Sequence, residues 1–457
     1  MKIFDTMKRG KVEIDLQKSR VVKLFVCGPT VQDSIHLGHA RTYIFFDVFA
    51  KYLRSKGYDV FYLQNITDID DKIIRKAKEE GISFSELAAR NTGVYMNALG
   101  KLGIDSINFF ARSTLFVDRI VEQVETLLKK GFAYRTEDGV YFRVSSFNDY
   151  GMLSGQPQNS LLEGARVETS ELKESQRDFV IWKARKEGEP FWSAPFGEGR
   201  PGWHIEDTAI TESLFGYTYD IHGGGSDLIF PHHEAEIAIE RSISGKDLLS
   251  RYWVHTGMLN LNDEKMSKSS GNFITLESTL EKWSSFELRY AFLNSQYRSV
   301  VNMSDETLQE ARSNCAKFSN MYHKLKREKF SGSGIGIDPE TWRTRMSERF
   351  EDDMDTRGVI TVLNDLAYKV NSSFPDLSEA EAMGVLNILE WANSILGILD
   401  TRSSNGNLDG IVQILIDLRN SLRKKRDFEN SDLIRKKLQE NGIYIEDRDH
   451  DTIWWQK

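Results

Sequence analysis

The sequence has 457 residues, of which 40% are hydrophobic and 28% charged, so it has the composition of a globular protein with two to four domains. The net charge of −8 excludes nucleic-acid binding by the surface as a whole and requires a local basic patch. Two cysteines, Cys27 and Cys315, exclude a disulfide framework and indicate a reducing compartment. Because no signal peptide or membrane-length apolar run is present, we expect a cytoplasmic protein without a membrane partner.

The first predicted elements form a strand–helix–strand unit. The β-branched run VVKLFVCG, residues 21–28, predicts a buried strand, and YDVFYLQNIT, residues 58–67, predicts a second one. Between them, apolar residues at helical spacing run from about Arg41 to a stop at Gly57. Such a unit is typical of α/β proteins with a doubly wound parallel sheet. The loop after the first strand lacks a G-x-G-x-x-G fingerprint and carries two histidines instead.

The remaining pattern divides the chain into regions. An amphipathic helix is predicted over 112–130, short strands over 131–200, and a return to the sheet over 217–230. From residue 304 the pattern is helical, with polar linkers at 327–340 and 402–410. We therefore predict a Rossmann-like parallel-sheet domain over 1–120 and 200–303, interrupted by an inserted connective region over 121–199. A helical bundle over 304–400 and an all-helical C-terminal region over 401–457 follow.

The motif His36-Leu37-Gly38-His39 lies between the first strand and the first helix. A helix N-terminus offers free N–H groups and a positive dipole to phosphate, histidines can hydrogen-bond phosphate oxygens, and a glycine permits close approach of a nucleotide. The structural alternative is that one histidine caps the helix and the other packs against it.

A second motif, Lys265-Met266-Ser267-Lys268-Ser269, is followed by SGN and lies more than 200 residues after the first. Two lysines and several hydroxyl groups suit a departing pyrophosphate, because they supply charge that strengthens as the transition state forms. The alternative is a solvated basic loop. Both motifs in this order make a nucleotide-dependent enzyme the better interpretation.

These two motifs resemble the signatures of class I aminoacyl-tRNA synthetases, and the surrounding sequence resembles the cysteinyl-tRNA synthetases. The resemblance rests on FVCGPTVQDSIHLGHARTY, NITDIDDKII, DFVIWKARKEGEPFWS, GRPGWHIE, HGGGSDLIFPHHEAE, EKMSKSSGNF and RDFENSDLIRKKLQENGIYIED. It covers essentially the whole chain. It implies activation of cysteine with Mg²⁺-ATP, transfer to the terminal ribose of tRNA(Cys), one zinc ion, and a C-terminal region that binds the anticodon. We expect a monomer.

The resemblance also implies roles for individual residues. The implied catalytic residues are His36, His39, Lys265 and Lys268. The implied ATP-binding residues are Thr30, His36, Gly38, His39, Asp227 and Lys268. The implied amino-acid-binding residues are Cys27, Gly28, Thr67, Trp203 and His204. Core packing at a turn is the alternative for Thr67, Trp203 and His204, and a loop cap is the alternative for Asp227.

The family's zinc ligands are two cysteines, a histidine and a glutamate. Cys27 matches the first cysteine, and His232 and Glu236 match the histidine and the glutamate, with a spacing that puts both on one face of a helix. The second cysteine is replaced by Asp207. Aspartate is a zinc ligand of the same formal charge but a harder donor, so we expect one ion, Zn²⁺, held by Cys27, Asp207, His232 and Glu236.

Three alternatives to this expectation stay open for Asp207. The metal could be lost, the pocket could accept another substrate, or Asp207 could be only the N-cap of a helix beginning at TAITESLF. The acidic residues Asp68, Asp70 and Asp71 are interpreted as loop caps and substrate-loop acids, not as a second metal site.

The C-terminal end has the composition of an RNA-binding surface. Basic side chains near aromatic ones suit phosphate contact and base stacking, and the alternative is a solvated basic helix with packed tryptophans. The residues are Arg423, Lys424, Lys425, Arg426, Arg435, Lys436, Lys437, Trp454 and Trp455. Two other functions stay open: a paralogue that ligates cysteine or another small amino acid to a non-tRNA amine, and a catalytically silent RNA-binding paralogue.

Overall fold

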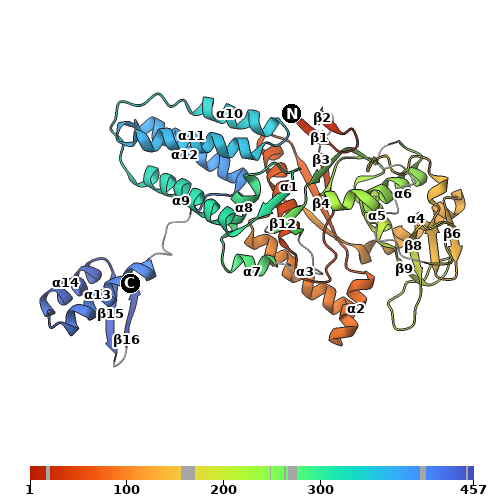
Figure 1. Ribbon diagram of the computed structural model, residues 1–457, viewed down its shortest axis with the longest axis horizontal. Helices are drawn as coiled ribbons and strands as arrows, with labels where there is room; N and C mark the ends of the chain where they lie inside the picture. The colour runs from red at the N-terminus through yellow and green to blue at the C-terminus, as the bar shows by residue number, and fades with distance from the viewer. Residues whose placement is uncertain are drawn as a thin grey trace. The chain divides into compact units, whose positions relative to one another are not determined.

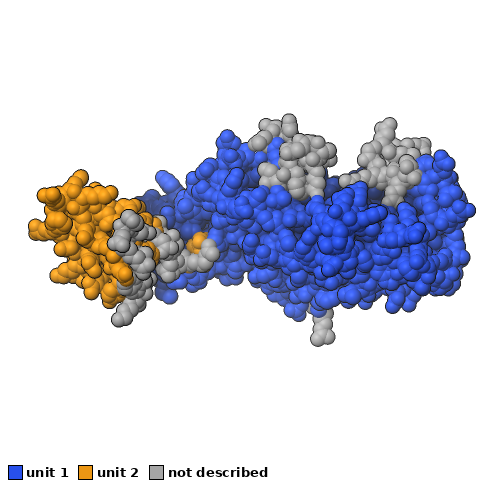
Figure 2. All heavy atoms as spheres, turned by 90° about the horizontal axis from the view of Figure 1, so that it is seen from below, with its two compact units in different colours: residues 1–399 blue, residues 400–457 orange. Residues whose placement is uncertain are grey.

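The computed structural model describes residues 1–16, 21–155, 170–247, 249–261, 264–265, 275–401, 408–448 and 451–456. The chain divides into two compact units, Met1–Leu399 and Asp400–Lys457 (Figures 1 and 2).

A five-stranded parallel sheet forms the centre of the first unit (Figure 1). Its order is β11-β10-β3-β4-β5, so the chain adds β4 and β5 on one side of β3 and later adds β10 and β11 on the other. Every pair of neighbours is parallel. The bounds are β3 Val22–Val26, β4 Val60–Ile66, β5 Phe109–Arg112, β10 Tyr219–Gly225 and β11 Ser250–Thr256.

Both faces of the sheet are buried, as the continuous apolar runs require. Along β3, Val22, Leu24 and Val26 face one hydrophobic core, and Phe25 and Cys27 face another. The first core is completed by helices α1 (Leu37–Ser55), α2 (Asp71–Glu80) and α3 (Phe84–Lys101), and the second by α4 (Val117–Lys130), α5 (Trp203–Phe215) and α6 (Glu234–Ser244). This α/β architecture confirms the predicted fold class and the strands predicted over 21–28 and 58–67.

The region between β5 and α5 contains a four-stranded antiparallel sheet. Its order is β6-β7-β8-β9, and its strands span Ala133–Thr136, Gly139–Phe142, Phe179–Ala184 and Gly199–Pro201. The helix predicted over 112–130 is found as a 3₁₀ turn, η1 (Ser113–Phe116), followed by α4. The short 3₁₀ turn η2 (Val144–Ser146) completes this region. The 3₁₀ turn η3 (Ser226–Leu228) and the segment η4 (Ile229–His233), in which Phe230 has extended backbone, follow β10 instead.

The chain leaves the sheet through a small three-stranded sheet and enters a helical layer. The small sheet has the order β13-β12-β14, with bounds Glu264–Lys265, Leu259–Leu261 and Val301–Met303. The helices are α7 (Leu276–Leu280), α8 (Ser285–Leu293), α9 (Asp305–Arg327), α10 (Pro339–Glu351), α11 (Thr356–Ser372) and α12 (Glu379–Leu396), with a 3₁₀ turn η5 (Phe374–Asp376). An N-terminal hairpin, β1 (Lys2–Asp5) and β2 (Gly10–Glu13), completes the first unit.

The second unit is not entirely helical, which corrects the prediction for 401–457. Helices α13 (Leu408–Lys424) and α14 (Phe428–Glu440) are followed by an antiparallel pair, β15 (Ile443–Arg448) and β16 (Asp451–Gln456). Ile443 and Ile445 alternate with polar residues and are buried, which is the pattern of a strand with one covered face. The unit has a core of its own, made of Val412, Ile416, Leu438, Ile443 and Ile445.

Candidate active site and metal centre

The candidate site lies where the order of the parallel sheet reverses, between β3 and β10. Ligands of open α/β sheets bind at this point, beyond the carboxyl ends of the strands. Cys27 directly follows β3, and its backbone N–H donates to the carbonyl of Gly223 in β10 at 3.0 Å. The sheet therefore aims the Cys27 side chain at the helices that follow β9 and β10.

Four buried side chains converge on this point. The Cys27 thiol donates to Asp207 Oδ2 at 2.9 Å. His232 Nε2 lies 3.1 Å from the same oxygen and 3.2 Å from Glu236 Oε1. One atom from each of the four residues lies within 4.8 Å of the others. Ligand atoms of a tetrahedral zinc site are roughly 3.3 to 3.8 Å apart because the bonds are about 2.0 to 2.3 Å long. The chain therefore assembles these donors at a spacing close to that of a metal site.

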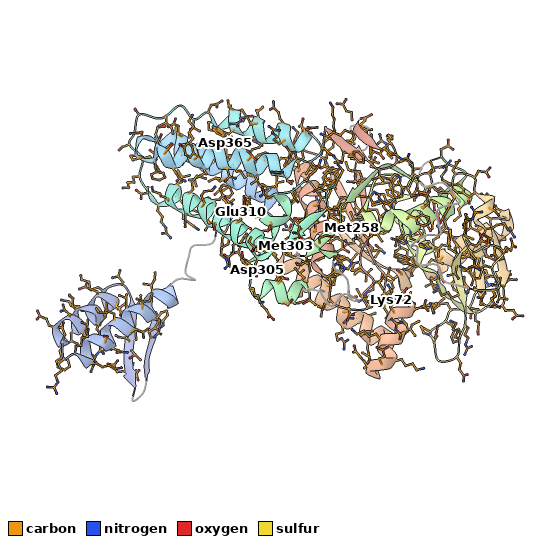
Figure 3. The ribbon with its side chains drawn as sticks, viewed as in Figure 1. Lys72, Met258, Met303, Asp305, Glu310 and Asp365 are labelled. Carbon is orange, nitrogen blue, oxygen red and sulfur yellow. The ribbon has the colours of Figure 1, made fainter. Side chains whose placement is uncertain are left out.

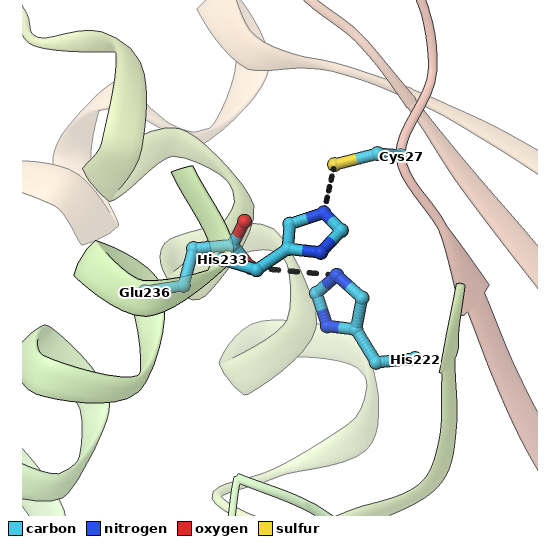
Figure 4. A group of neighbouring side chains, drawn as sticks. All are labelled: Cys27, His222, His233 and Glu236. Carbon is cyan, nitrogen blue, oxygen red and sulfur yellow. Dashed lines mark hydrogen bonds and ion pairs between the residues drawn. The ribbon is translucent and has the colours of Figure 1, made fainter. Parts of the chain in front are cut away.

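Two further histidines share Cys27 and Glu236 with this set (Figure 4). His233 Nε2 is 3.4 Å from Cys27 Sγ, and His222 Nε2 is 3.7 Å from Glu236 Oε2. Cys27, His222, His233 and Glu236 therefore form a second group of four possible ligands. An ion beside Cys27 has two neighbouring positions available, one with Asp207 and His232 and one with the two other histidines.

The histidines of both sets are held by a second layer of contacts. The ring nitrogen that faces away from the cluster has a polar partner in each case, an arrangement that orients metal-binding histidines in proteins. Trp203 also stacks on the ring of His232, with centroids 4.2 Å apart and planes inclined by 9°. The polar pairs are His232–His204 at 2.9 Å, His233–His255 at 2.8 Å and His222–Tyr219 at 2.7 Å.

Buried polar atoms in this cluster make no hydrogen bond. They are Asp207 Oδ1, His222 Nε2 and both carboxylate oxygens of Glu236. Burial, with the nearby Asp207 and Glu236 carboxylates, raises the pKa of the Cys27 thiol well above its usual value. Burial and Asp207 likewise raise the pKa of Glu236. A divalent cation that displaced these protons would satisfy the unpartnered atoms, so the donor set fits a bound metal ion.

Asp207 lies inside α5, whose N-cap is Gly202. The alternative in which Asp207 is only an N-cap is therefore wrong. The carboxylate is instead fully buried and points toward Cys27 and His232.

The other predicted amino-acid-binding residues line the same region. Gly28 follows Cys27, and its N–H donates to Asn65 Oδ1. Thr67 lies just beyond β4, and its hydroxyl donates to the buried carboxylate of Glu206 at 3.0 Å. Burial raises the pKa of Glu206 well above its usual value. Trp203 and His204 begin α5 and lie against His232, so these residues and the cluster share one site.

The predicted phosphate-binding motif begins α1. His36 is the N-cap, and its Nδ1 accepts from Gly38 N–H at 3.1 Å, while His39 Nδ1 accepts from His36 N–H at 3.5 Å. The two imidazole rings stack with centroids 3.8 Å apart. One histidine caps the helix, as the structural alternative stated, and both remain at its N-terminus. The helix begins at Leu37, four residues before the predicted Arg41. The sequence did not indicate this earlier start, because histidine is an uncommon N-cap.

Thr30 and Asp227, two of the predicted ATP-binding residues, follow the central strands β3 and β10. Thr30 continues the pairing of β3 and β4 through a parallel bridge to Thr67. Asp227 is exposed in η3, the turn that follows β10. Both residues therefore lie beyond the carboxyl ends of central strands.

The second motif is described only in part. The backbone of Lys265 lies in β13 and pairs with Asn260 in β12. Lys268 lies outside the described residues. Further along, the Leu276 N–H donates to the Ile35 carbonyl at 3.0 Å, and Thr275 pairs with His36. The return of the chain from the second motif therefore contacts the start of the first.

The three acidic residues after β4 have structural partners. Asp70 is the N-cap of α2 and accepts from Lys72 N–H at 2.9 Å. Asp68 accepts from the N–H and hydroxyl of Thr114. Asp71 pairs with Lys183 and Arg200, and these contacts hold its pKa at about 2 in spite of burial. The interpretation of Asp70 as a loop cap is confirmed.

A family model for the catalytic domain of class I (C) tRNA synthetases matches residues 13–313. The cysteine–tRNA ligase of Thermoplasma volcanium is 49% identical over 458 residues, covering 100% of both chains. That of Thermoplasma acidophilum is 48% identical over 455 residues, again covering 100% of both. That of Clostridioides difficile is 40% identical over 468 residues and covers 99% of both. The chain belongs to the cysteine–tRNA ligase family.

Solved synthetases share the fold of this family member. Methionyl-tRNA synthetase of Mycobacterium tuberculosis in complex with methionyl-adenylate has a TM-score of 0.61 at 18% identity, over 83% of this chain and 90% of that chain. LeuRS from Agrobacterium radiobacter K84, in a ternary complex, has a TM-score of 0.61 at 11% identity, over 83% and 84%. At this identity the likeness shows the fold alone. No helix in the described part of the chain is long and apolar enough to cross a membrane.

Several residues of this ligase-family site were not predicted from the sequence. His222, His233 and His255 join the cluster, and Glu206 holds Thr67. His222 and His233 stand in the HGGGSDLIFPHHEAE stretch that carries the resemblance, so their position in a motif was a usable signal. His255 carried no signal, because only the parallel pairing of β11 with β10 brings it to the site.

Proposed function

We propose that this chain activates cysteine with Mg²⁺-ATP and transfers it to the 3′-terminal ribose of tRNA(Cys). The observation that carries the proposal is the convergence of Cys27, Asp207, His232 and Glu236 at the sheet's switch point, beside the start of α1. The cysteine carboxylate attacks the α-phosphate of ATP, the Pα–O bond to pyrophosphate breaks, and cysteinyl-adenylate forms. A ribose hydroxyl of the tRNA then attacks the activated carbonyl and releases AMP.

Positioning and charge stabilisation account for the first step. His36, Gly38 and His39, at the N-terminus of α1, hold the phosphates where the helix dipole is favourable. Lys265 and Lys268 stabilise the charge that develops on pyrophosphate. Thr30 and Asp227 contact the nucleotide from the ends of the neighbouring strands.

We propose that Cys27, Asp207, His232 and Glu236 hold one Zn²⁺. A bound Zn²⁺ would supply a soft Lewis acid that prefers the sulfur of cysteine to the oxygen of serine. This preference matters because an apolar pocket discriminates weakly between near-isosteres. Gly28, Thr67, Trp203 and His204 surround the amino acid. Asp207 is a harder donor than thiolate, so we expect the ion to be held less tightly than by two cysteines.

We propose that the second unit binds tRNA through exposed cations on α13, α14 and the turn between them. Phe428, exposed beside this turn, is the better candidate for base stacking, because Trp454 is half-buried against the unit's core. The side chain of Trp455 lies outside the described residues. The exposed cations are Arg423, Lys424, Lys425, Arg426, Arg435, Lys436 and Lys437. We also propose that the chain acts as a monomer in the cytoplasm; the free cysteines, Cys27 and Cys315, agree with the reducing compartment.

The metal assignment is tested by elemental analysis of the purified protein, with and without cysteine. We expect about one zinc per chain in the wild type, little in Asp207→Ala, and tighter retention in Asp207→Cys. His232→Asn and His222→Asn form a matched pair. The first should lose the ion and the second should keep most of it.

If His222→Asn lost the ion and His232→Asn kept it, the ion would instead be held by Cys27, His222, His233 and Glu236. Pyrophosphate exchange with cysteine and with serine, measured on the same variants, tests the function. Little metal in every form, together with full rejection of serine, would contradict the proposed role of zinc.

A further inference from the structure

Arg41 lies in the second turn of α1, and its guanidinium donates to five backbone carbonyls from two separate segments. Its Nη1 donates to one segment and its Nη2 to the other. Arg41 is 3% exposed, so these bonds are shielded from water. The acceptors are Gly257 at 2.6 Å, Met258 at 2.7 Å, Gln296 at 3.3 Å, Tyr297 at 3.0 Å and Ser299 at 2.6 Å.

The surroundings of Arg41 are unusual for a buried cation. Among the described side chains, none forms an ion pair with it, and burial lowers the pKa of Arg41 to about 10. Burying a charge without a counter-charge is costly, and the five hydrogen bonds from the two Nη atoms are the compensation available here. The guanidinium therefore depends on both segments being in place at once.

The two segments lead directly into the small sheet. Met258 precedes β12, and residues 296–299 precede β14, which pairs with β12; Figure 3 labels Met258 and, at the far end of β14, Met303. On its other side β12 pairs with β13, where Asn260 faces Lys265. A second link lies beside the first, since the hydroxyls of Thr42 and Thr256 are 2.7 Å apart. The start of α1 is thus tied to the small sheet, whose strand β13 carries Lys265.

We propose that Arg41 is a positioning residue that sets the distance between the His36–His39 end of α1 and the Lys265 backbone. This inference rests on the proposed ATP site, in which the two motifs act on the same phosphates. The guanidinium touches neither substrate, and it acts through the carbonyls that it gathers. A displacement of about 1 Å between groups that act on the same substrate is enough to slow a reaction roughly a hundredfold.

A lysine cannot replace the guanidinium here. Lysine offers three donors from one nitrogen, whereas arginine offers five in a flat fork that reaches two segments. Arg41→Lys keeps the charge but leaves several carbonyls unpaired. We expect kcat of ATP–pyrophosphate exchange to fall roughly a hundredfold, with KM for cysteine within about threefold of the wild type.

Arg54 provides a matched control on the same helix. Its guanidinium donates to the carbonyls of Val60 and Ser106 and to Asn108 Oδ1, away from both motifs. Arg54→Lys therefore removes a comparable set of bonds without touching the small sheet. We expect its kcat to stay within about threefold of the wild type, even where its melting temperature falls as far as that of Arg41→Lys.

The segments whose carbonyls accept from Arg41 offer an independent variant. This variant keeps the test decisive if Arg41→Lys does not fold. A Cβ on Gly257 would lie 2.2 Å from the carbonyl oxygen of Ser299 and 2.4 Å from that of Arg298. Gly257→Ala therefore forces the two segments apart while leaving Arg41 intact. We expect the same loss in kcat.

The measurements separate this inference from the proposed site. The role of Arg41 would be overturned if kcat of pyrophosphate exchange in Arg41→Lys and Gly257→Ala stayed within threefold of the wild type. It would also be overturned if their kcat were no lower than that of Arg54→Lys. His39→Ala is the reference for the site itself. If His39→Ala is impaired and Arg41→Lys is not, only the inference fails. If His39→Ala also exchanges normally, the proposed ATP site is wrong.

Discussion

At the scale of single residues, Gly28 decides where Cys27 points. A Cβ on Gly28 would lie 1.8 Å from the Asn65 carbonyl oxygen and 2.9 Å from the Asn65 carbonyl carbon. Both are backbone atoms at the end of β4, so no side-chain rotation relieves the contact. The missing side chain therefore allows the carboxyl ends of β3 and β4 to approach closely, which sets the Cys27 side chain beside Asp207.

Gly28→Ala should destabilise the first unit by about 2 to 4 kcal/mol, because the added methyl group overpacks against backbone. Thermal unfolding checks the stability, and zinc content checks the displacement of Cys27. Gly93, exposed in the interior of α3 with nothing within 4 Å of its missing Cβ, is the control. Gly93→Ala should stabilise the protein by about 0.5 to 1 kcal/mol. Equal changes in stability for Gly28→Ala and Gly93→Ala would contradict the proposed close approach of backbone at Gly28.

At the scale of elements, α6 carries three buried glutamates in different surroundings. Glu234 accepts from the N–H groups of Leu153 and Ser154. Glu236 is one of the four candidate ligands that include Cys27. Glu240 is 1% exposed, and neither of its carboxylate oxygens makes a hydrogen bond. Burial, reinforced by the nearby Glu212, raises the pKa of Glu240 to about 8.

This raised pKa makes the stability of the first unit depend on pH. Below pH 4.5 Glu240 is protonated in both the folded and the unfolded chain. Between pH 4.5 and about 8 only the unfolded chain loses this proton, so the contribution of Glu240 becomes less favourable as pH rises. Each pH unit in this window costs about 1.4 kcal/mol.

Glu240→Gln should therefore stabilise the protein at pH 8 by on the order of 4 kcal/mol and leave its stability unchanged near pH 4.5. Melting temperatures measured across this range test the slope. Glu310→Gln, which alters an exposed glutamate on α9 (Figure 3), is the control and should follow the wild type. A constant difference between Glu240→Gln and the wild type at every pH would contradict the prediction.

The sequence predicted the elements whose boundaries have local causes. β3 and β4 were predicted because each is a β-branched and aromatic run that ends near a turn signal. The early start of α1 was missed because its cap is His36. The hairpin of β15 and β16 was missed because the helical pattern before it was extended to the chain end. The contact of His255 with His233 could not be predicted, because only the order of the strands brings β11 beside β10.

At the scale of the whole molecule, the two units divide the chain at Leu399. Of the residues that line the candidate site, all those described belong to the first unit. The exposed cations proposed to bind tRNA belong to the second, which has its own buried core. Activation of the amino acid and recognition of the RNA are therefore assigned to separately packed parts.

A chain ending at Leu399 should retain pyrophosphate exchange and lose tRNA aminoacylation. If this truncation removes about 3 kcal/mol of tRNA binding free energy, kcat/KM for tRNA should fall roughly a hundredfold. Both activities are measured on the same preparation. A full-length chain carrying Lys424→Gln and Lys425→Gln is a milder test that keeps the second unit. Its aminoacylation should be weaker than that of the wild type and should depend less steeply on salt concentration, because fewer phosphate contacts release counterions. An equal fall in both activities would indicate that the second unit is structural.

The order of strands in the central sheet also has a consequence during synthesis. Cys27 emerges from the ribosome long before Asp207, His232 and Glu236. The strand before it, β3, can pair with β4 early, but it cannot pair with β10 until that strand has been synthesised. At 5–20 residues per second the delay is on the order of 10 to 40 s. During that interval Cys27 is a lone thiol without its partners. The ion proposed for this site can be bound by all four residues only after Glu236 has been translated, and until then the exposure of Cys27 to oxidants depends on the speed of translation.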